Sequence, residues 1–529
     1  MPDRKIAALD RRAFLRASGA LGAAAAFTAS LSACGGPEST VYAGDGTGRD
    51  TIEAGLSYTL STGFDPMITS GATPYAANMH IFEGLVDLDP ATLDPRPGLA
   101  TGMPEKKDEL TYRATLREGA TFHDGSEVTA EDVVFSFERV LDKKNASIMA
   151  QFVPFLDKVR AVDRRTVEFR LKHAFELFPS RISVVRIVPK KIVERDPKGF
   201  DAKPVGSGPY RLVGATREDR ITFARWDRYN GKHPARAKTM VWRLISDSSA
   251  RVSALESGRV QAIEDVPYLD IDRMKDFSTV RQVPSFGLLF LMFNCARKPF
   301  DDRRVRQALH HAVDTEKLIR IALLGGGDAA TGYLQRDHPD HRRAATVYGY
   351  DPGRARELLR EAGVRRLDVE LLVTDTGWVN DAAPLVKEAW DAVGVETSLS
   401  IAQSPAQYAK VDQGRYQALL APGDPSVFGN DVDLLMRWFY NGLWPETRYG
   451  WKDDPRYRTL TSLLDDAARS TDGKERSRLW AKAQDLVAAE VPLYPLLHRR
   501  LPCAWAPDEL ERFRPLPTTG LSFLGTARA

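Results

Sequence analysis

An almost unbroken apolar run occupies positions 285–294 and reads SFGLLFLMFN. Such a run is typical of a strand that is buried on both of its faces. After a short loop, apolar residues recur at helical spacing over positions 305–313, and Asp301 or Asp302 can cap that helix. We therefore expect this strand and the amphipathic helix after it to form the centre of the fold.

The same patterns predict the other elements of the chain. Period-two alternation indicates strands at 52–60, 112–116 and 167–171, and a hairpin within 210–223. Helices are expected at 75–85, after Thr129, and between Asp247 and Gly258. Further on, a helix, strand, helix and strand follow at 350–363, 368–373, 381–393 and 396–401. This β-α-β order favours parallel strands. Two late helices, 459–468 and 475–489, precede a second apolar run at 491–497.

The first 33 residues have the pattern of an export signal: basic residues, an uncharged run rich in alanine, and small residues at the end. The segment Arg11-Arg12-Ala-Phe-Leu-Arg resembles a twin-arginine export motif. Leu31-Ser-Ala-Cys34 resembles a lipobox, in which Cys34 becomes the lipidated first residue. A plain secretory signal with an incidental cysteine is the alternative. Residues 34–50 are rich in glycine and polar side chains, which predicts a flexible tether.

Composition narrows the class of protein. The chain has 529 residues, enough for two or three cores, and its 43% hydrophobic and 27% charged content is ordinary for a globular protein. Residues 1–33 hold five basic and two acidic side chains, so their removal leaves 69 of each charge. A neutral mature chain argues against binding nucleic acid by electrostatic attraction. Beyond the signal, no segment is long and apolar enough to span a bilayer.

Several phrases resemble family 5 extracellular solute-binding proteins of ABC transporters. The match includes FLMFNCARKPFDDRRVRQALHHAVD at 290–314, a His-Asp-Gly turn at 123–125 between a strand and a helix, and VGSGPY at 205–210. The resemblance extends from about Thr51 to His498. It implies a two-lobed, periplasmic-binding-protein-like α/β fold of class II, the large peptide-binding type, with a hinge between the lobes.

The resemblance also implies a domain plan. Lobe 1 covers 51–285 and is rejoined by 493–529, whereas lobe 2 covers 286–492. The expected protein is an extracytoplasmic monomer, anchored to the cell membrane through Cys34, that captures peptides or oligopeptides between its lobes and delivers them to the permease subunits of an importer. The alternative is another solute: a nickel chelate, haem, an oligosaccharide or a siderophore.

Family members that bind peptides hold the ligand's α-ammonium with an aspartate in a loop rich in Asp-Pro, and Asp424 is the position that matches. An Asp-Pro turn with no ligand role is the alternative. Aromatic side chains supply unspecific apolar contact in such clefts. We expect four aromatic side chains to contact the ligand: Trp438, Trp444, Trp378 from the loop after strand 368–373, and Phe286 from the crossing strand. The sequence shows no match for an arginine that binds a ligand carboxylate.

Catalytic and metal chemistry find little support. The sequence lacks a Gly-x-Ser-x-Gly elbow and a His-Glu-x-x-His helix, so a secreted hydrolase is a weak alternative, and we expect a protein that is not an enzyme and has no cofactor or metal. His123 belongs to a structural turn. Cys295 and Cys503 lie beside the two proposed crossings, where they can form a disulfide in an oxidising compartment or remain separate buried thiols.

Overall fold

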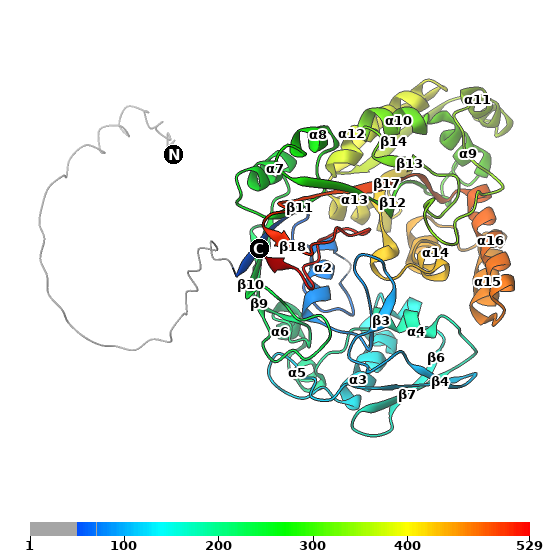
Figure 1. Ribbon diagram of the computed structural model, residues 1–529. Coiled ribbons are helices and arrows are strands. Elements are labelled where there is room, and N and C mark those ends of the chain that lie inside the picture. The colour runs from blue at the N-terminus through cyan, green and yellow to red at the C-terminus, as the bar shows by residue number, and fades with distance from the viewer. Residues whose placement is uncertain (1–49, 70) are drawn as a thin grey trace, which may run out of the picture. The chain divides into compact units, whose positions relative to one another are not determined.

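The computed structural model describes residues 50–69 and 71–529, so the predicted export signal and Cys34 lie outside the described residues. An 11-stranded mixed sheet extends through this part of the chain (Figure 1). Ten strands follow one another in the order β15 (Val395–Ala402), β14 (Leu367–Thr374), β16 (Ala418–Gly423), β12 (Thr279–Phe293), β17 (Leu493–Trp505), β11 (Ala262–Glu264), β1 (Thr51–Leu56), β10 (Thr239–Leu244), β9 (Arg220–Arg225) and β8 (Tyr210–Thr216); β13 (Gly327–Ala329) pairs with β17.

Smaller sheets and fifteen helices complete the described residues. A four-stranded antiparallel sheet has the order β4 (Glu105–Asp108), β5 (Thr111–Thr115), β7 (Thr166–Leu171), β6 (Leu156–Ala161), and two pairs are β2 (Val86–Leu88) with β3 (Pro95–Pro97) and β18 (Leu510–Glu511) with β19 (Ala527–Arg528). The helices before β12 are α2 (Ala72–Ile81), α3 (Ala130–Leu141), α4 (Phe178–Arg181), α5 (Lys190–Arg195), α6 (Pro197–Ala202), α7 (Ser248–Glu256) and α8 (Ile271–Met274). Those after it are α9 (Arg303–Ala312), α10 (Thr315–Ala322), α11 (Pro352–Glu361), α12 (Gly377–Asp391), α13 (Ser404–Asp412), α14 (Val432–Tyr440), α15 (Pro455–Arg469) and α16 (Gly473–Glu490).

The predicted central strand is confirmed as part of β12, which pairs with β16 on one side and antiparallel with β17 on the other. Its two faces enter different hydrophobic clusters: Phe286, Leu288 and Phe290 join one, while Leu289 and Leu291 join another. This explains why the run lacks polar alternation. Strands β12 and β17 lie side by side and join the two halves of the large sheet (Figure 1).

Local signals set many element ends correctly. Asp302 caps α9 by accepting a hydrogen bond from the Arg304 amide at 2.9 Å. At α3, the Thr129 hydroxyl and amide both contact Asp132, at 2.7 and 3.0 Å, so the capping box with aspartate is present. Strand β14 pairs in parallel with β15 and β16, as the β-α-β order predicts.

Several predicted boundaries are wrong; for example, β1 ends at Leu56 rather than at 60, and α15 begins at Pro455 rather than at 459. Helix α2 ends at Ile81, before the predicted end at 85, because Phe82 is extended and Gly84 forms a bridge with Arg186. Helix α12 begins at Gly377 rather than near 381, so Trp378 lies in its first turn and not in a loop. The carbonyl of Thr376 accepts hydrogen bonds from the amides of Val379 and Asn380, which completes this additional turn.

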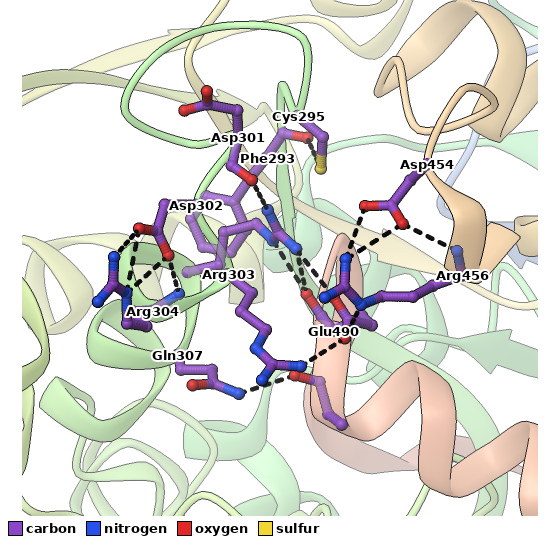
Figure 2. A network of polar contacts seen from close by, with 12 residues as sticks. Phe293, Cys295, Asp301, Asp302, Arg303, Arg304, Gln307, Asp454, Arg456 and Glu490 are labelled. Carbon is purple, nitrogen blue, oxygen red and sulfur yellow. Dashed lines mark hydrogen bonds and ion pairs between the residues drawn. The ribbon is translucent and has the colours of Figure 1, made fainter. Parts of the chain in front are cut away.

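A network of charged side chains lies where β12 ends and β17 begins (Figure 2). Glu490, the last residue of α16 before β17, is only 3% exposed and accepts hydrogen bonds or ion pairs from Arg303 and Arg456, each at 2.9 Å. Arg306 on α9, which follows β12, donates to the backbone carbonyl of Glu490 at 2.7 Å. The network therefore connects the helix that leaves β12 to the helix that leads into β17.

The disulfide considered for Cys295 and Cys503 is not formed: both are free, buried thiols. Cys295 belongs to the hydrophobic cluster around α14–α16, whereas Cys503 belongs to the cluster around β1 and β8–β10. The alternative of two separate thiols therefore describes the structure, because the cysteines lie at opposite ends of the β12–β17 pair: Cys295 follows Phe293, whereas Cys503 is in register with Arg281.

Candidate ligand site

Two of the predicted site residues follow neighbouring parallel strands. Trp378 comes after β14, and Asp424 comes directly after β16. Because β14 and β16 are parallel and adjacent, their carboxyl ends meet at the same edge of the sheet. In open α/β sheets this edge is where ligands bind. The fold thus brings Trp378 and Asp424 to one place, although 45 residues separate them in the sequence.

Asp424 is a carboxylate with one oxygen engaged and one free. Its Oδ1 accepts hydrogen bonds from the amide and hydroxyl of Ser426, at 3.1 and 2.5 Å. Its Oδ2 is buried and has no hydrogen-bond partner among the described residues; the Thr519 amide lies nearby, but not in the geometry of a hydrogen bond. Burial raises the pKa of Asp424 from 3.8 to about 6, and the hydrogen bonds from Ser426 offset only part of that effect.

Arg499 on β17 faces this region and was missed from the sequence. It is 5% exposed, and its Nη2 forms an ion pair with Asp265 at 2.7 Å. Its Nε donates to the hydroxyl of Tyr268 at 3.2 Å, and its guanidinium lies 4.4 Å from the ring centroid of Trp378. Burial disfavours the charge, but Tyr268 and Asp265 outweigh burial and hold the pKa of Arg499 above its usual value.

The sequence does not single out Arg499. Alternate residues of a strand face the same side, and both faces of β17 are apolar: Leu497 and Cys503 share the face of Arg499, whereas Pro502 and Ala504 share the face of Arg500. Only the tertiary contacts of Arg499 with Asp265 and Trp378 distinguish it from its exposed neighbour.

Two acidic residues, Asp265 and Glu264, lie near Arg499. Asp265 has a left-handed backbone, with φ of 53°, and its carboxylate lies 2.7 Å from Arg499 and 3.7 Å from Arg251. A non-glycine residue in this conformation carries backbone strain, which is often found at ligand sites. Glu264 accepts hydrogen bonds from the Ser57 amide at 3.0 Å and the Gly520 amide at 2.6 Å, and burial raises its pKa.

Segments far apart in sequence enclose a small cavity beside Arg499. They are the end of β1, the turn after β11, strand β17 and the C-terminal tail. Its lining residues are Tyr58, Glu264, Asp265, Arg499, Leu501, Pro502, Cys503, Leu516, Thr518, Thr519 and Gly520. The tail is fixed to the first half of the chain, since the Phe523 amide donates to Nε2 of His80 at 3.0 Å. This contact is consistent with the predicted return of 493–529 to lobe 1, which stays a prediction.

None of the residues predicted to contact the ligand lines this cavity, Asp424 and Trp378 included. Trp438 stacks on Phe152 with ring centroids 6.0 Å apart, and Trp444 packs edge-on against Phe439 at 4.8 Å. Phe286 is 1% exposed and contacts the ring of His498. All three pack against protein side chains, so a role for them in ligand contact stays a prediction.

Contacts beyond the cavity join the segments assigned to the two lobes. Arg181 on α4 is 1% exposed and pairs with Asp431 and, at 3.1 Å, with Asp433. These acidic residues cap and begin α14, on the far side of the predicted division. Tyr75 on α2 meets Phe428 edge-on with ring centroids 4.9 Å apart. A buried ion pair and an aromatic pair therefore connect the two predicted lobes.

Two of the described histidines contact backbone groups. The ring of His123 contacts the Gly208 carbonyl at 2.9 Å and the Gly206 amide at 3.2 Å, as expected for a turn residue. His338 contacts the Asn430 carbonyl at 2.7 Å. Within residues 50–69 and 71–529, no three histidine, cysteine, aspartate or glutamate side chains gather as a metal site would require.

The comparison with known families decides the class of protein. The model of the bacterial extracellular solute-binding proteins, family 5 Middle, matches residues 94–444. The chain belongs to this family. Its members are extracytoplasmic substrate-binding proteins of ABC importers, and the fold is the expected two-lobed class II fold. None of the helices that the structure describes combines the length and apolarity needed to cross a membrane.

Individual relatives cover nearly the whole chain. The glutathione-binding protein GsiB of Salmonella typhimurium is 26% identical over 473 residues, which are 87% of this chain and 91% of that protein. The dipeptide-binding protein of Escherichia coli is 26% identical over 471 residues, 82% of this chain and 87% of its own length.

Solved structures agree on the fold. The binding protein AgaA from A. tumefacien, in complex with agropinic acid, has a TM-score of 0.81 and 26% identity, and the match covers 90% of this chain and 99% of AgaA. A dipeptide-binding protein from pseudoalteromonas, in complex with Met-Leu, has a TM-score of 0.80 and 22% identity, with coverage of 90% and 100%.

Proposed function

We propose that this family 5 protein captures a small solute with a free amine, a peptide or an amino-acid derivative, and presents it to the permease of an ABC importer. The single observation that carries the proposal is Asp424, a buried carboxylate whose Oδ2 has no partner among the described residues. A buried carboxylate is costly unless a cation pairs with it, and an ammonium group from the ligand would provide that cation.

The named relatives support this class of ligand. GsiB binds glutathione, and the Escherichia coli relative binds dipeptides, by their names; both ligands carry a free amine. By their names the relatives are solute-binding proteins, which favours solute capture over a secreted hydrolase. Haem carries no amine for Asp424, so it fits this carboxylate less well than a peptide does.

The lobe boundaries and the anchor belong to the same proposal. The first lobe is 51–285 with 493–529, the second is 286–492, and residues 34–50 connect a lipid on Cys34 to the fold. Closure about β12 and β17 would trap the ligand between the two lobes, with Asp424 supplied by the second lobe. The predicted monomeric state is consistent with one ligand site formed by one chain.

Calorimetry with an Asp424→Asn variant tests the amine contact. The variant should bind a free-amine dipeptide about 2–5 kcal/mol more weakly than the wild type, the usual cost of removing one member of a desolvated charge pair. An N-acetylated dipeptide should bind the wild type weakly and lose little further in the variant. Equal affinity of the two proteins for the free amine would refute the proposal.

Asp472→Asn is the matched control. Asp472 also caps a helix, since its carboxylate accepts a hydrogen bond from the Lys474 amide at 2.8 Å, but it lies at the exposed start of α16. This variant loses one negative charge, as Asp424→Asn does, and the amide oxygen of its asparagine can still accept the hydrogen bond that caps the helix. Its affinity for both dipeptides should equal that of the wild type.

A further inference from the structure

We propose that a second small pocket, formed between the β2–β3 hairpin and the C-terminal tail, binds a phosphate group. This pocket, hereafter the tail pocket, is lined by neither Asp424 nor Trp378, so the inference does not depend on the proposed function. Its basic and hydroxyl-bearing lining residues are Arg96, Arg512, Arg514, His233, Ser522 and Thr526.

The carboxylate that lines the tail pocket already has its partners. Both oxygens of Asp89 accept from Nη2 of Arg514, at 3.0 and 2.8 Å. Oδ1 of Asp89 also accepts from the amides of Ala91 and Thr92, at 3.0 and 3.1 Å. Asp89 therefore balances one arginine of the pocket, and the positive charges of the other two arginines have no carboxylate among the described residues that line it.

Arg96 on β3 is the first of these two arginines. Asp87 lies opposite it in the β2–β3 pairing, but Asp87 forms its ion pair with Arg186. Arg96 is half-buried, and its Nε is fully buried without a hydrogen-bond partner in the described part of the chain. A buried donor without an acceptor costs free energy that a bound anion would recover.

Arg512 in the tail is the second arginine. It directly follows β18 and has a left-handed backbone, with φ of 60°. Backbone strain of this kind in a residue other than glycine is common at ligand sites. The residue is exposed and lines the pocket, so an anion can reach its guanidinium from solvent.

Two buried hydroxyls and a histidine supply further donors. Thr526 and Ser522 are 1% and 7% exposed. The Ser522 oxygen accepts from the Leu524 amide at 3.4 Å, so the hydroxyl proton can donate to a ligand. Burial lowers the pKa of His233, but a neutral imidazole still carries one N–H donor.

This set of donors suits a tetrahedral oxyanion better than a carboxylate. One guanidinium can satisfy the two oxygens of a carboxylate by itself. A phosphate group presents its oxygens in several directions, and the tail pocket offers donors from the hairpin, from the segment between β9 and β10, and from the tail. The pocket is small, so it suits one such group rather than a whole peptide.

Two sources carry this chemistry. One is phosphate in solution. The other is the headgroup of a phospholipid, beside which the predicted anchor on Cys34 would hold the protein. Either group would tie the tail to the hairpin, because Arg512 and Ser522 belong to the tail and Arg96 belongs to the hairpin.

Isothermal calorimetry of the whole protein with inorganic phosphate, at constant ionic strength, tests the site. Arg96→Gln and Arg512→Gln should each weaken phosphate binding about 10- to 100-fold, the range for a hydrogen bond to a charged group. Neither arginine has an ion-pair partner among the described residues, so both variants should unfold in phosphate-free buffer at the temperature of the wild type. Phosphate should raise that temperature in the wild type and much less in the variants.

Arg259→Gln is the matched control. Arg259 is exposed, forms no ion pair with the described residues and does not line the tail pocket. This variant loses one positive charge, as Arg512→Gln does, and should bind phosphate as the wild type does. Asp424→Asn should also bind phosphate with unchanged affinity, because the solute site is separate from the tail pocket.

Sedimentation with phospholipid vesicles distinguishes the two sources. The Cys34→Ser protein is used, so that a lipid anchor cannot cause retention. Retention on phosphatidylglycerol vesicles that is lost in Arg512→Gln and kept in Arg259→Gln would identify a lipid headgroup as the ligand. Binding of inorganic phosphate without retention on vesicles would identify phosphate in solution.

Three results would overturn the inference. The first is that neither inorganic phosphate nor the vesicles bind. The second is that Arg96→Gln and Arg512→Gln bind phosphate, or are retained on vesicles, as the wild-type pocket is. The third is a phosphate affinity that changes in Asp424→Asn, which would place the anion in the solute site instead of the tail pocket.

Discussion

Replacing Asp424 by asparagine should stabilise the ligand-free protein, although it weakens ligand binding. Burial raises the pKa of this carboxyl from 3.8 to about 6. The folded state then binds more protons than the unfolded state between these two values, so Asp424 lowers the stability as pH rises through that window. Above about pH 6 the full cost is present.

The magnitude follows from the pKa difference. Each pKa unit corresponds to about 1.4 kcal/mol, so the ionised carboxyl costs the fold up to about 3 kcal/mol at neutral pH and roughly half of that at pH 5. Asparagine cannot ionise, and its amide oxygen can still accept from Ser426, though more weakly than a carboxylate. After about 1 kcal/mol is deducted for that weaker hydrogen bond, we expect a net gain of about 2 kcal/mol at pH 7.5.

Urea denaturation of the ligand-free wild type and Asp424→Asn at pH 5 and pH 7.5 measures this effect. The difference in unfolding free energy should increase by about 1–1.5 kcal/mol between the two pH values. Asp472→Asn, at the exposed helix cap, is measured beside it as the matched control. If Asp424→Asn is less stable than the wild type at pH 7.5, or if its difference is independent of pH, the buried carboxylate is not the costly group that the site requires.

Three further perturbations test the wider architecture. Cys34→Ser should release the protein from membranes that retain the wild type, because several acyl chains anchor firmly; equal partitioning in a membrane fractionation would contradict the lipobox. Arg181→Gln should reduce ligand affinity at least tenfold without a ligand contact, because it removes the buried ion pairs to Asp431 and Asp433 that join the predicted lobes. Small-angle scattering should show ligand-induced compaction in the wild type and less in Arg181→Gln, whereas an unchanged radius with confirmed binding would indicate a rigid site. Glu490→Gln should lower the unfolding free energy by about 2 kcal/mol, because it weakens a buried acceptor of two half-exposed arginines (Figure 2). The exposed Glu361→Gln control should change the unfolding free energy little in the same urea titration. Equal stabilities of Glu490→Gln and the wild type would refute a supporting role for the network.

Local chemistry in the sequence determined the elements and the class of fold. The apolar run of β12 has no polar alternation because both of its faces are buried, and that property is visible in the residues alone. Capping residues such as Asp302 and Thr129 act within a few positions of the helix that they begin, so their effect is local. The family resemblance rests on such short phrases, and the match over 94–444 confirms it.

The ligand site depended on contacts between distant positions. Asp424 was predicted, but its unpaired oxygen and its raised pKa result from burial that no local pattern reports. Arg499 was missed because its partner Asp265 lies 234 positions earlier and Trp378 121 positions earlier, and only the pairing of β17 with its neighbours brings them together.

Burial and long-range pairing also decided which predicted residues stayed apart. Trp438 and Trp444 looked suitable for a ligand wall by type, but they pack on Phe152 and Phe439, because an aromatic side chain gains similar free energy against protein or ligand. Cys295 and Cys503 likewise make their apolar contacts in separate hydrophobic clusters rather than with each other. Residue type and spacing thus determine which element forms, whereas the partner of a buried charge or ring is set by the tertiary packing that removes both from water.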